Sequence, residues 1–500
     1  QRQMCIRDRN TGITRMSKNN KSVKVNFIMN AILNLSAVIF PLITFPYVSR
    51  ILTPTGTGRV SSAVALVTYF AMVAQLGIPT YGIRACAIVR DDKEKLSRTA
   101  QEIFIINMIM SVIVYGVFFG ALFFIPEMAE DKTLYLICST TIVFNLIGME
   151  WLYKALEEYS YITKRSLFFK FIALVLTFVC IHTKDDYLFY GVTTIFAASA
   201  SNVMNFINVR KYITLKPLRN YDFKHHMKPI LIFFGMSVAT TIYTNLDTVM
   251  LKFMQGNEAA GYYTAAVKVK TVLVGVVTSI GTVLLPRVSY YIEQKRHDEF
   301  RKVTAKAMEL VVMMALPLVV YFIIYAREAI LVLSGADYIP AIIPMQLIMP
   351  TVFLIGFTNI TGIQILIPQG RENIVLISEI VGAVVDFAIN LVLIPSMGSS
   401  GAAIGTLVAE LAVLIVQAIA MWKFLMEIMR KIKAGKIVLA CVLGTVVALL
   451  VHLLPITNSF MILVITALLF FGIYGGGLLL MKEPLVYEVV GQMKEKFLKK

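Results

Sequence analysis

The sequence predicts an all-α integral membrane protein with about 14 transmembrane helices. Hydrophobic residues occupy 58% of its 500 positions and charged residues only 15%, whereas soluble domains average about 25% charged residues. Apolar runs of about 18 to 25 residues recur along the chain, and each is long enough to cross about 30 Å of hydrocarbon as a helix. A helix satisfies its own backbone hydrogen bonds in lipid, so an all-helical fold follows.

The apolar runs set the positions of the expected elements. We expect spans at residues 25–49, 60–88, 100–125, 133–153, 166–183, 187–209, 229–254, 259–288, 304–325, 341–367, 374–395, 401–424, 437–454 and 459–481. Residues 1–15 form no apolar run and precede Met16, so we interpret them as a non-native or disordered leader. Residues 482–500 alternate apolar residues with lysines, which is typical of an amphipathic tail lying on the cytoplasmic membrane surface.

The basic residues predict the orientation. The net charge is +17, but the lysines and arginines lie mainly in the short connections between apolar runs. With the N-terminus in the cytoplasm, roughly 34 of them fall on the cytoplasmic side and about five outside. We therefore expect a multi-pass protein of the inner (cytoplasmic) membrane with both termini in the cytoplasm. A nucleic-acid partner is not expected, because the charge follows topology.

Short connections exclude several classes of protein. None exceeds about 20 residues, which leaves no room for a soluble catalytic or nucleotide-binding domain. The chain lacks the phosphate-binding G-x-x-x-x-G-K-[ST] motif and the zinc motif H-E-x-x-H. The five cysteines show no metal-ligand spacing. We expect neither an enzyme, nor a cofactor, nor a metal site, so energy would come from an ion gradient or from chemistry elsewhere.

Two parts of the chain are alike. Residues 49–52 with 58–64 parallel residues 251–254 with 261–267, and Gly58 and Gly261 occupy equivalent places. Six predicted spans separate them, which favours two lobes related by an axis along the membrane normal. The predicted parts are an N-terminal lobe at 16–228, a C-terminal lobe at 229–424 and additional spans at 425–481. Two glycine pairs, Gly116 with Gly120 and Gly472 with Gly476, have the spacing of closely packed helices.

Several segments carry a family resemblance. They are Pro41 to Leu52, Gly77 to Arg84, Glu150 to Tyr159, and Asn245 to Leu251 with Gly261-Tyr262-Tyr263. In this order and spacing the chain resembles the polysaccharide or O-antigen flippase family of the multidrug/oligosaccharidyl-lipid/polysaccharide exporter superfamily, from Met16 onward. The resemblance implies two lobes around a central cavity, alternating access, and a polyprenyl-diphosphate-linked oligosaccharide as substrate. It leaves open contacts with a polysaccharide polymerase and assembly proteins, besides the membrane lipids.

Charged residues inside the spans are candidate functional groups because burying a charge in lipid is costly. Asp247 in the seventh span shares a depth with Lys268 and Lys270 in the eighth. A structural ion pair between Asp247 and one lysine is one interpretation. The other lysine would then need water or an anion.

A basic cavity would suit a diphosphate, since lysine and arginine replace part of its hydration. The candidate substrate-binding residues are Arg50, Arg84, Lys252, Lys268 and Lys270. For Arg50 and Arg84 the alternative is that their side chains extend to lipid head groups.

Two carboxylates, Asp386 and Glu410, lie at similar depth on the eleventh and twelfth spans. If they face each other, they could share a proton or hold a cation, which predicts coupling to a proton or sodium gradient. The alternative is hydrogen bonding to Asn390, Thr406 or the backbone.

Three functions remain after these exclusions. The leading hypothesis is a flippase for lipid-linked oligosaccharides in polysaccharide biosynthesis. A cation-coupled multidrug exporter of the same superfamily is the second, and it would favour an acidic cavity over a basic one. A membrane polysaccharide polymerase or glycosyltransferase is the third, and it would usually place its catalytic residues in a larger loop than any found in this sequence.

Overall fold

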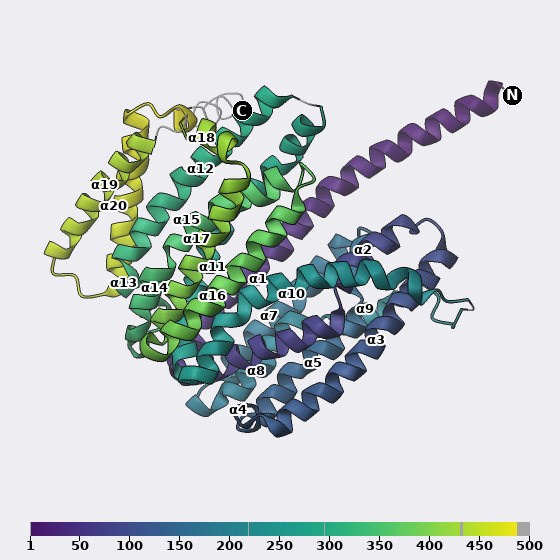
Figure 1. The fold of residues 1–500 in the computed structure, drawn as a ribbon, viewed down its shortest axis with the longest axis horizontal. Helices are drawn as coiled ribbons and strands as arrows, with labels where there is room; N and C mark the ends of the chain where they lie inside the picture. Colours follow the sequence, from purple (N-terminus) through teal and green to yellow (C-terminus); the bar gives the residue numbers. More distant parts are fainter. Residues whose placement is uncertain (1, 219, 295, 431–433, 488–500) are drawn as a thin grey trace. The chain divides into compact units, whose positions relative to one another are not determined.

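The computed structural model describes residues 2–218, 220–294, 296–430 and 434–487, with side chains from Val25 onward except at 27, 280–287 and 289. These residues form helices and no strand (Figure 1), so the predicted all-α class is confirmed. The chain divides into two structural units. Unit 1 contains residues 1–51 and 63–241, and unit 2 contains residues 52–62 and 242–500.

Unit 1 is built from short and long helices that begin with the first part of the chain. They are α1 (Arg2–Gln75), α2 (Ile78–Ile88), α3 (Lys93–Phe124), α4 (Pro126–Ala129), α5 (Lys132–Gly148), α6 (Glu150–Ala155), α7 (Tyr159–Cys180), η1 (Lys184–Asp186), α8 (Tyr187–Ile195), the π-helix η2 (Phe196–Ala200), α9 (Asn202–Asn208), η3 (Val209–Lys211) and the first part of α10 (Phe223–Gln255). Among them α2 packs on α6, and α5 packs on α3, α8 and α9.

Unit 2 contains the second part of α10 and all later helices. They are α11 (Asn257–Glu293), α12 (His297–Ile324), α13 (Ala326–Leu333), η4 (Ala336–Ala341), α14 (Ile342–Ile348), α15 (Pro350–Thr358), the π-helix η5 (Asn359–Leu366), α16 (Glu372–Met397), α17 (Ser399–Ala420), α18 (Trp422–Met429), α19 (Ala434–Leu450), η6 (Val451–Leu453) and α20 (Ser459–Leu480). Helices α16 and α17 form an antiparallel hairpin, and α19 and α20 form another (Figure 1).

The first two predicted spans are joined differently from what we expected. Helix α1 runs through the predicted connection and is kinked at Thr53, whose φ is 60°. The chain instead breaks inside the second predicted span, at Gly77 between α1 and α2. Gly77 has a φ of 72°, and a Cβ there would overlap the backbone of Phe233 and Phe234 in α10. Glycine is therefore required at this turn, both for its conformation and for the close approach.

Nine helices of the described residues are long and apolar enough to cross a membrane, or ten if the bent pair 336–348 and 350–366 is one span. One of the nine, Ile28–Ile88, joins most of α1 to α2 across the turn at Gly77. It has 61 residues, enough for two crossings of about 20 residues each. Helix α5 has only 17 residues, and the π-helix η2 interrupts the predicted sixth span. A multi-pass membrane protein is confirmed, and the number 14 stays a prediction.

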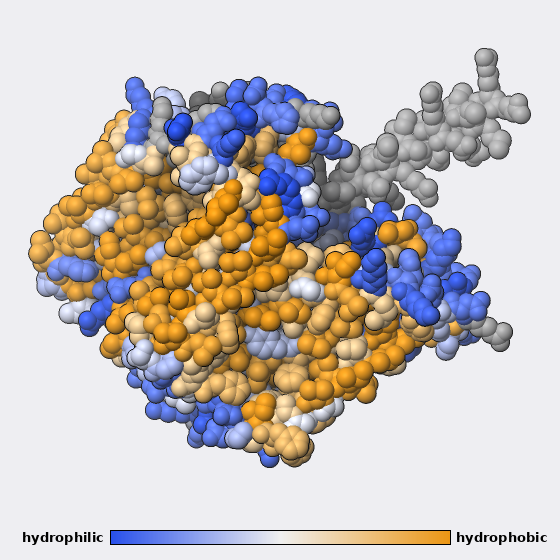
Figure 2. Space-filling view, viewed as in Figure 1, coloured by the Kyte–Doolittle hydropathy of each residue, from blue (hydrophilic) through white to orange (hydrophobic). Residues whose placement is uncertain are grey.

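The outer faces of the helices are apolar. Figure 2 shows hydrophobic side chains along the helices and hydrophilic ones gathered near helix ends. Large exposed apolar residues include Val112 and Phe124 on α3 and Leu468 and Leu480 on α20. A soluble protein rarely exposes such extended apolar surface, so these faces fit a hydrocarbon environment.

The residues of the proposed repeat meet inside unit 2. A Cβ added at Gly58 would overlap the carbonyl of Asn257, and one added at Gly261 would overlap the carbonyl of Pro54. The Thr264 hydroxyl donates to Ser61 over 2.9 Å. Each glycine therefore lets the other helix approach closely, as small residues do at packed membrane helices. The division into lobes at 228 and 424 stays a prediction.

Candidate functional site

Four helices of unit 2 bring an acidic cluster together. The cluster consists of Tyr243 and Asp247 on α10, Tyr263 and Lys270 on α11, Asp386 and Asn390 on α16, and Thr406 and Glu410 on α17. On α10, α16 and α17 the two members are four residues apart, so they lie on one face of the helix. The packed α16 and α17 hairpin sets two of these faces against each other.

Asp247 is the best-satisfied carboxylate of the acidic cluster. Its Oδ1 accepts a hydrogen bond from the Asn390 amide over 2.6 Å, and its Oδ2 accepts one from the Thr406 hydroxyl over 2.8 Å. The Tyr263 hydroxyl also donates to Oδ2. Three donors therefore satisfy the hydrogen-bonding capacity of this buried carboxylate. The predicted ion pair with Lys268 or Lys270 stays a prediction.

Asp386 lies beside Asp247, and their carboxyl groups interact directly. Asp386 is 1% exposed and Asn390 is 0% exposed. Within the described chain, Oδ1 of Asp386 and Oδ1 of Asn390 are buried oxygens without a hydrogen-bond donor. Because unsatisfied buried oxygens are costly, this pair is suited to accept a proton or a small cation.

Gly405 makes room for these two oxygens. A Cβ at this position would overlap Asn390 Oδ1 and would lie 3.0 Å from Asp386 Oδ1. A larger residue would therefore displace the two acceptors that face α17.

Glu410 is the third carboxylate of the acidic cluster. Its carboxyl lies next to the Tyr243 hydroxyl, and Lys270 is close enough to interact electrostatically with both Glu410 and Asp386. The carboxyl groups of Asp386 and Glu410 are also close enough to interact electrostatically. Asn390 and Thr406, the alternative hydrogen-bond partners expected for Asp386 and Glu410, both donate to Asp247, and hydrogen bonds from them to Asp386 or Glu410 stay a prediction.

The predicted basic residues are divided between the two units. Arg50 and Arg84 belong to unit 1, while Lys252, Lys268 and Lys270 belong to unit 2. Arg50 is exposed and donates to the Pro46 carbonyl of its own helix. Lys252 is buried, and Lys268 and Lys270 are half-buried. A shared basic cavity stays a prediction.

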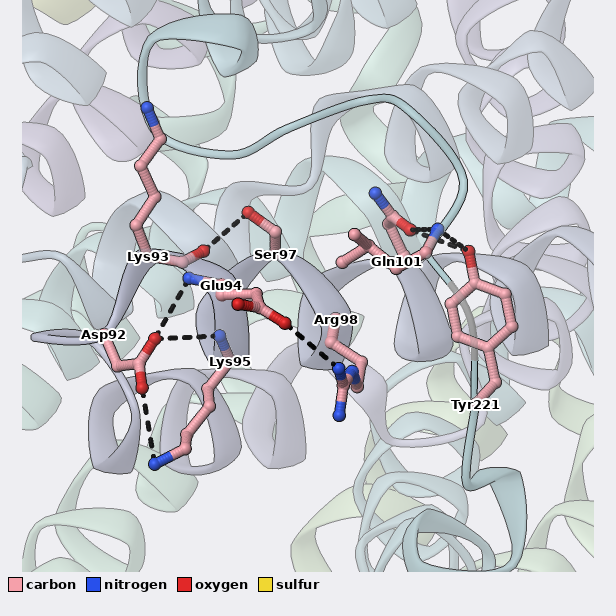
Figure 3. A network of polar contacts seen from close by, with 9 residues as sticks. Asp92, Lys93, Glu94, Lys95, Ser97, Arg98, Gln101 and Tyr221 are labelled. Carbon is pink, nitrogen blue, oxygen red and sulfur yellow. Dashed lines mark hydrogen bonds and ion pairs between the residues drawn. The ribbon is translucent and has the colours of Figure 1, made fainter.

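Arg84 lines a cavity in unit 1. This cavity has a volume of about 360 Å³ and lies between α2, α3 and the start of α10. Nearby, the N-terminal part of α3 holds the connection that leads to α10 (Figure 3). Gln101 accepts from the Tyr221 hydroxyl over 2.7 Å, and its amide donates to the carbonyl of Lys216 over 3.0 Å. The chain entering α10 is thereby fixed to α3.

The described residues contain no group of three or more histidine, cysteine, aspartate or glutamate side chains arranged to hold a metal ion. Around Asp247 and Asp386 the acidic cluster offers the two aspartate carboxylates, the amide oxygen of Asn390 and the hydroxyls of Thr406 and Tyr263, with the Glu410 carboxylate nearby. Such hard oxygen donors suit a proton or an alkali cation better than a transition metal.

Two family models match the chain over overlapping ranges. The model described as polysaccharide biosynthesis protein matches residues 23–292, and the model described as lipid II flippase MurJ matches residues 166–469. Each covers more than half of the chain. The chain belongs to the polysaccharide biosynthesis protein family. The resemblance to this part of the multidrug/oligosaccharidyl-lipid/polysaccharide exporter superfamily is therefore confirmed.

Two relatives of this family member carry the name "Putative O-antigen transporter". The one from Escherichia coli strain K12 is 22% identical over 364 residues, which are 72% of this chain and 86% of the relative. The one from Shigella dysenteriae is 22% identical over 409 residues, 79% of this chain and 98% of the relative.

Solved structures show the same fold. The lipid II flippase MurJ in an inward closed conformation has a TM-score of 0.71 at 15% identity, over 92% of this chain and all of that one. An inward-facing multidrug resistance MATE family transporter has a TM-score of 0.60 at 14% identity, over 81% of this chain and 98% of that one.

Sequence reasoning missed Tyr243 and Tyr263 as members of the acidic cluster in this family protein. Tyr243 could have been found, because it precedes Asp247 by one helical turn on the same face. No local pattern marks Tyr263, since its contact with Asp247 depends on how α11 returns against α10 and α17.

Proposed function

We propose that the protein is a flippase that moves a polyprenyl-diphosphate-linked oligosaccharide from the cytoplasmic to the outer leaflet of the inner membrane, for polysaccharide biosynthesis. Membership of the polysaccharide biosynthesis protein family is the observation that carries this substrate class, and two relatives named as O-antigen transporters support it. Transport proceeds by alternating access, with both termini in the cytoplasm. A polysaccharide polymerase and assembly proteins are the expected partners.

The cargo requires basic groups within the membrane. A diphosphate would lose its hydration on entering hydrocarbon, and charge-assisted hydrogen bonds from lysine or arginine offset that loss. Lys252, Lys268 and Lys270 of unit 2 lie in helices long and apolar enough to cross the membrane. Arg50 and Arg84 of unit 1 are the other candidates, while the lipid tail remains in the bilayer.

The acidic cluster supplies ion coupling in this proposal. Asp386 Oδ1 and Asn390 Oδ1 are buried acceptors without a donor among the described residues, and they lie beside the hydrogen-bonded Asp247. A cation or a proton would supply the missing positive partner. A proton or a sodium ion bound there would cancel the repulsion between the two aspartates. The inward or outward gradient of that ion then drives one direction of the conformational cycle.

A cation-coupled multidrug exporter is the second candidate, since carboxylates also attract organic cations. The carboxylates of the acidic cluster are deeply buried, with Asp386 at 1%, Glu410 at 6% and Asp247 at 7% exposed. A drug-sized molecule cannot reach them without a large rearrangement, so the burial favours a small ion and disfavours direct drug binding.

Leaflet transfer in vesicles tests the function. The purified full chain, reconstituted with a lipid-linked oligosaccharide, should accelerate its transfer between leaflets. Replacing Lys268 by alanine should reduce transfer roughly ten- to a hundredfold, because a charge-assisted contact contributes about 1.5 to 3 kcal/mol. Lys268→Glu should reduce it further by repelling the diphosphate.

Lys170→Ala is the matched control, because Lys170 is a half-buried helical lysine that bonds the Ser36 hydroxyl of unit 1 over 2.8 Å. All rates are divided by the amount of inserted protein. Unchanged transfer in both Lys268 variants would contradict the role of this lysine, and transfer of a cationic drug in place of the oligosaccharide would favour the exporter.

A further inference from the structure

Three buried titratable side chains form a row of hydrogen bonds between α2, α10 and α3 in unit 1. The Tyr81 hydroxyl of α2 lies 2.6 Å from Nδ1 of His226 on α10, and Nε2 of His226 lies 2.8 Å from Oε2 of Glu102 on α3. His226 and Glu102 are each only 4% exposed and Tyr81 is 6% exposed. These contacts join three helices through a single imidazole.

The carboxylate end of this row is fixed. Oε1 of Glu102 accepts from the backbone N–H of Asp222 over 2.7 Å, and the neighbouring Gln101 holds Tyr221 over 2.7 Å (Figure 3). Glu102 therefore has one oxygen engaged with the connection before α10 and the other with His226.

The unit 1 cavity gives His226 access to small species. Tyr81, Glu102 and His226 all line this partly open space of about 360 Å³. The volume holds several water molecules at roughly 30 Å³ each. A proton can therefore reach the imidazole through water, although the side chain itself is buried.

The imidazole can be satisfied in two protonation states. In the neutral state Nε2–H donates to Glu102, and Nδ1 accepts from the Tyr81 hydroxyl. In the protonated state both ring nitrogens donate, so the Tyr81 oxygen becomes the acceptor and its O–H turns to another partner.

We propose that His226 is a proton-binding site of this protein, separate from the acidic cluster of unit 2, and that its proton sets the direction of the Tyr81 hydrogen bond between α10 and α2. A metal ion is not the ligand here, because both ring nitrogens are already engaged and no metal-binding group occurs among the described residues. An anion would face two carboxylates in the cavity.

The titratable and charged groups that face His226 come from each packed element. They are Tyr81 and Arg84 of α2, Glu102 of α3, and Asp222 and His225 of its own segment, with Cys86 behind Tyr81. Of these, Glu102 and Tyr81 bond the imidazole directly.

Intrinsic fluorescence of the full chain tests the site without any substrate. The sequence has two tryptophans, and Trp422→Phe leaves Trp151, whose ring packs on Gly82 next to Tyr81. In this background we expect a pH-dependent fluorescence transition as the imidazole gains or loses its proton. His226→Gln should abolish the transition. His225→Gln, which removes the adjacent imidazole from the same cavity, should retain it.

Glu102→Gln provides a second measurement that keeps His226 in place. Losing the carboxylate charge should move the midpoint to lower pH, because the negative charge beside the imidazole is removed. A transition that persists unchanged in His226→Gln, one that is lost in His225→Gln, or no transition at all would overturn the proposal. If His226→Gln fails to fold, an unmoved midpoint in Glu102→Gln would also overturn it. The test needs no transport, so its failure leaves the flippase proposal untouched.

Discussion

The sequence predicts some side chains of the acidic cluster but not the contacts between them. Asp386 and Glu410 stand out in the sequence because charges in apolar runs are rare, and their equal distance from one turn predicts that they are close. The interaction between Asp386 and Asp247 was not predicted, because it depends on the packing of α10 against α16. The sequence therefore shows which spans carry the carboxylates, but not which carboxylates contact each other.

Replacing Asp386 by asparagine should abolish the dependence of transport on the ion gradient. The amide keeps the size of the side chain but cannot be charged, so a bound cation would lose one of its two carboxylates. The measurement is leaflet transfer with and without an imposed proton or sodium gradient. Wild-type gradient dependence in both Asp386→Asn and Glu410→Gln would exclude the acidic cluster from coupling.

Glycine substitutions provide a control with matched chemistry. Gly405→Ala places a methyl group against Asp386 and Asn390 and should weaken the gradient dependence as well. Gly472→Ala in α20 adds the same methyl group where no atom lies within 4 Å of it, so it should leave the dependence unchanged.

Helices and their ends were predicted unevenly. Long apolar helices such as α12 and α16 lie where the hydropathy places them. The predicted close packing at Gly116, Gly120, Gly472 and Gly476 is wrong for the described residues, because a Cβ at each would meet nothing within 4 Å. Spacing alone cannot tell a helix face that meets another helix from one that meets lipid.

The start of α3 shows how a polar residue fixes a helix end. The Asp92 side chain accepts from the backbone N–H groups of Glu94 and Lys95, each over 3.1 Å (Figure 3). These N–H groups have no partner within the helix. The hydrogen bond from the Lys95 backbone, with help from Glu94 and the Lys95 ammonium, lowers the pKa of Asp92.

Asp92→Ala should lower the thermal melting temperature at neutral pH by removing this cap. Because the pKa of Asp92 is lowered in the folded chain, its contribution is present above the unfolded value of about 3.9 and disappears as pH falls through the folded value. The difference between wild type and variant should therefore shrink below about pH 4.

Asp91→Ala is the control for the cap, since it removes an adjacent exposed carboxylate and leaves Asp92 in place. An equal loss of melting temperature in both variants would show that general surface charge, not the cap, is responsible.

For the whole molecule, the orientation is the largest property left to test. The basic connections predict that both termini and the 210–228 connection lie on one side of the membrane. The turn between α16 and α17 falls on the other side if the predicted spans are right. The side assigned to each connection follows from the basic residues and from the number of spans before it. Neither quantity determines whether a helix that bends, or that a π-helix interrupts, crosses the membrane.

Lys216→Cys, in a variant without the native cysteines, should react with a membrane-impermeant thiol reagent only from the cytoplasmic side. Ser396→Cys, near the turn between α16 and α17, should react only from outside and serves as the matched control. Labelling of Lys216→Cys exclusively from outside would reverse the topology.

The placement of residues 52–62 affects how the chain is made. The ribosome produces this segment early, yet Gly58 makes its closest contacts with Asn257 and Gly261 of α11, which are synthesised much later. Domains usually fold as units during synthesis, with the N-terminal one first. Unit 2 cannot follow this order, because its segment of α1, residues 52–62, is synthesised long before the rest of the unit. The glycine face of residues 52–62 therefore stays without its α11 partner until synthesis has passed Gly261.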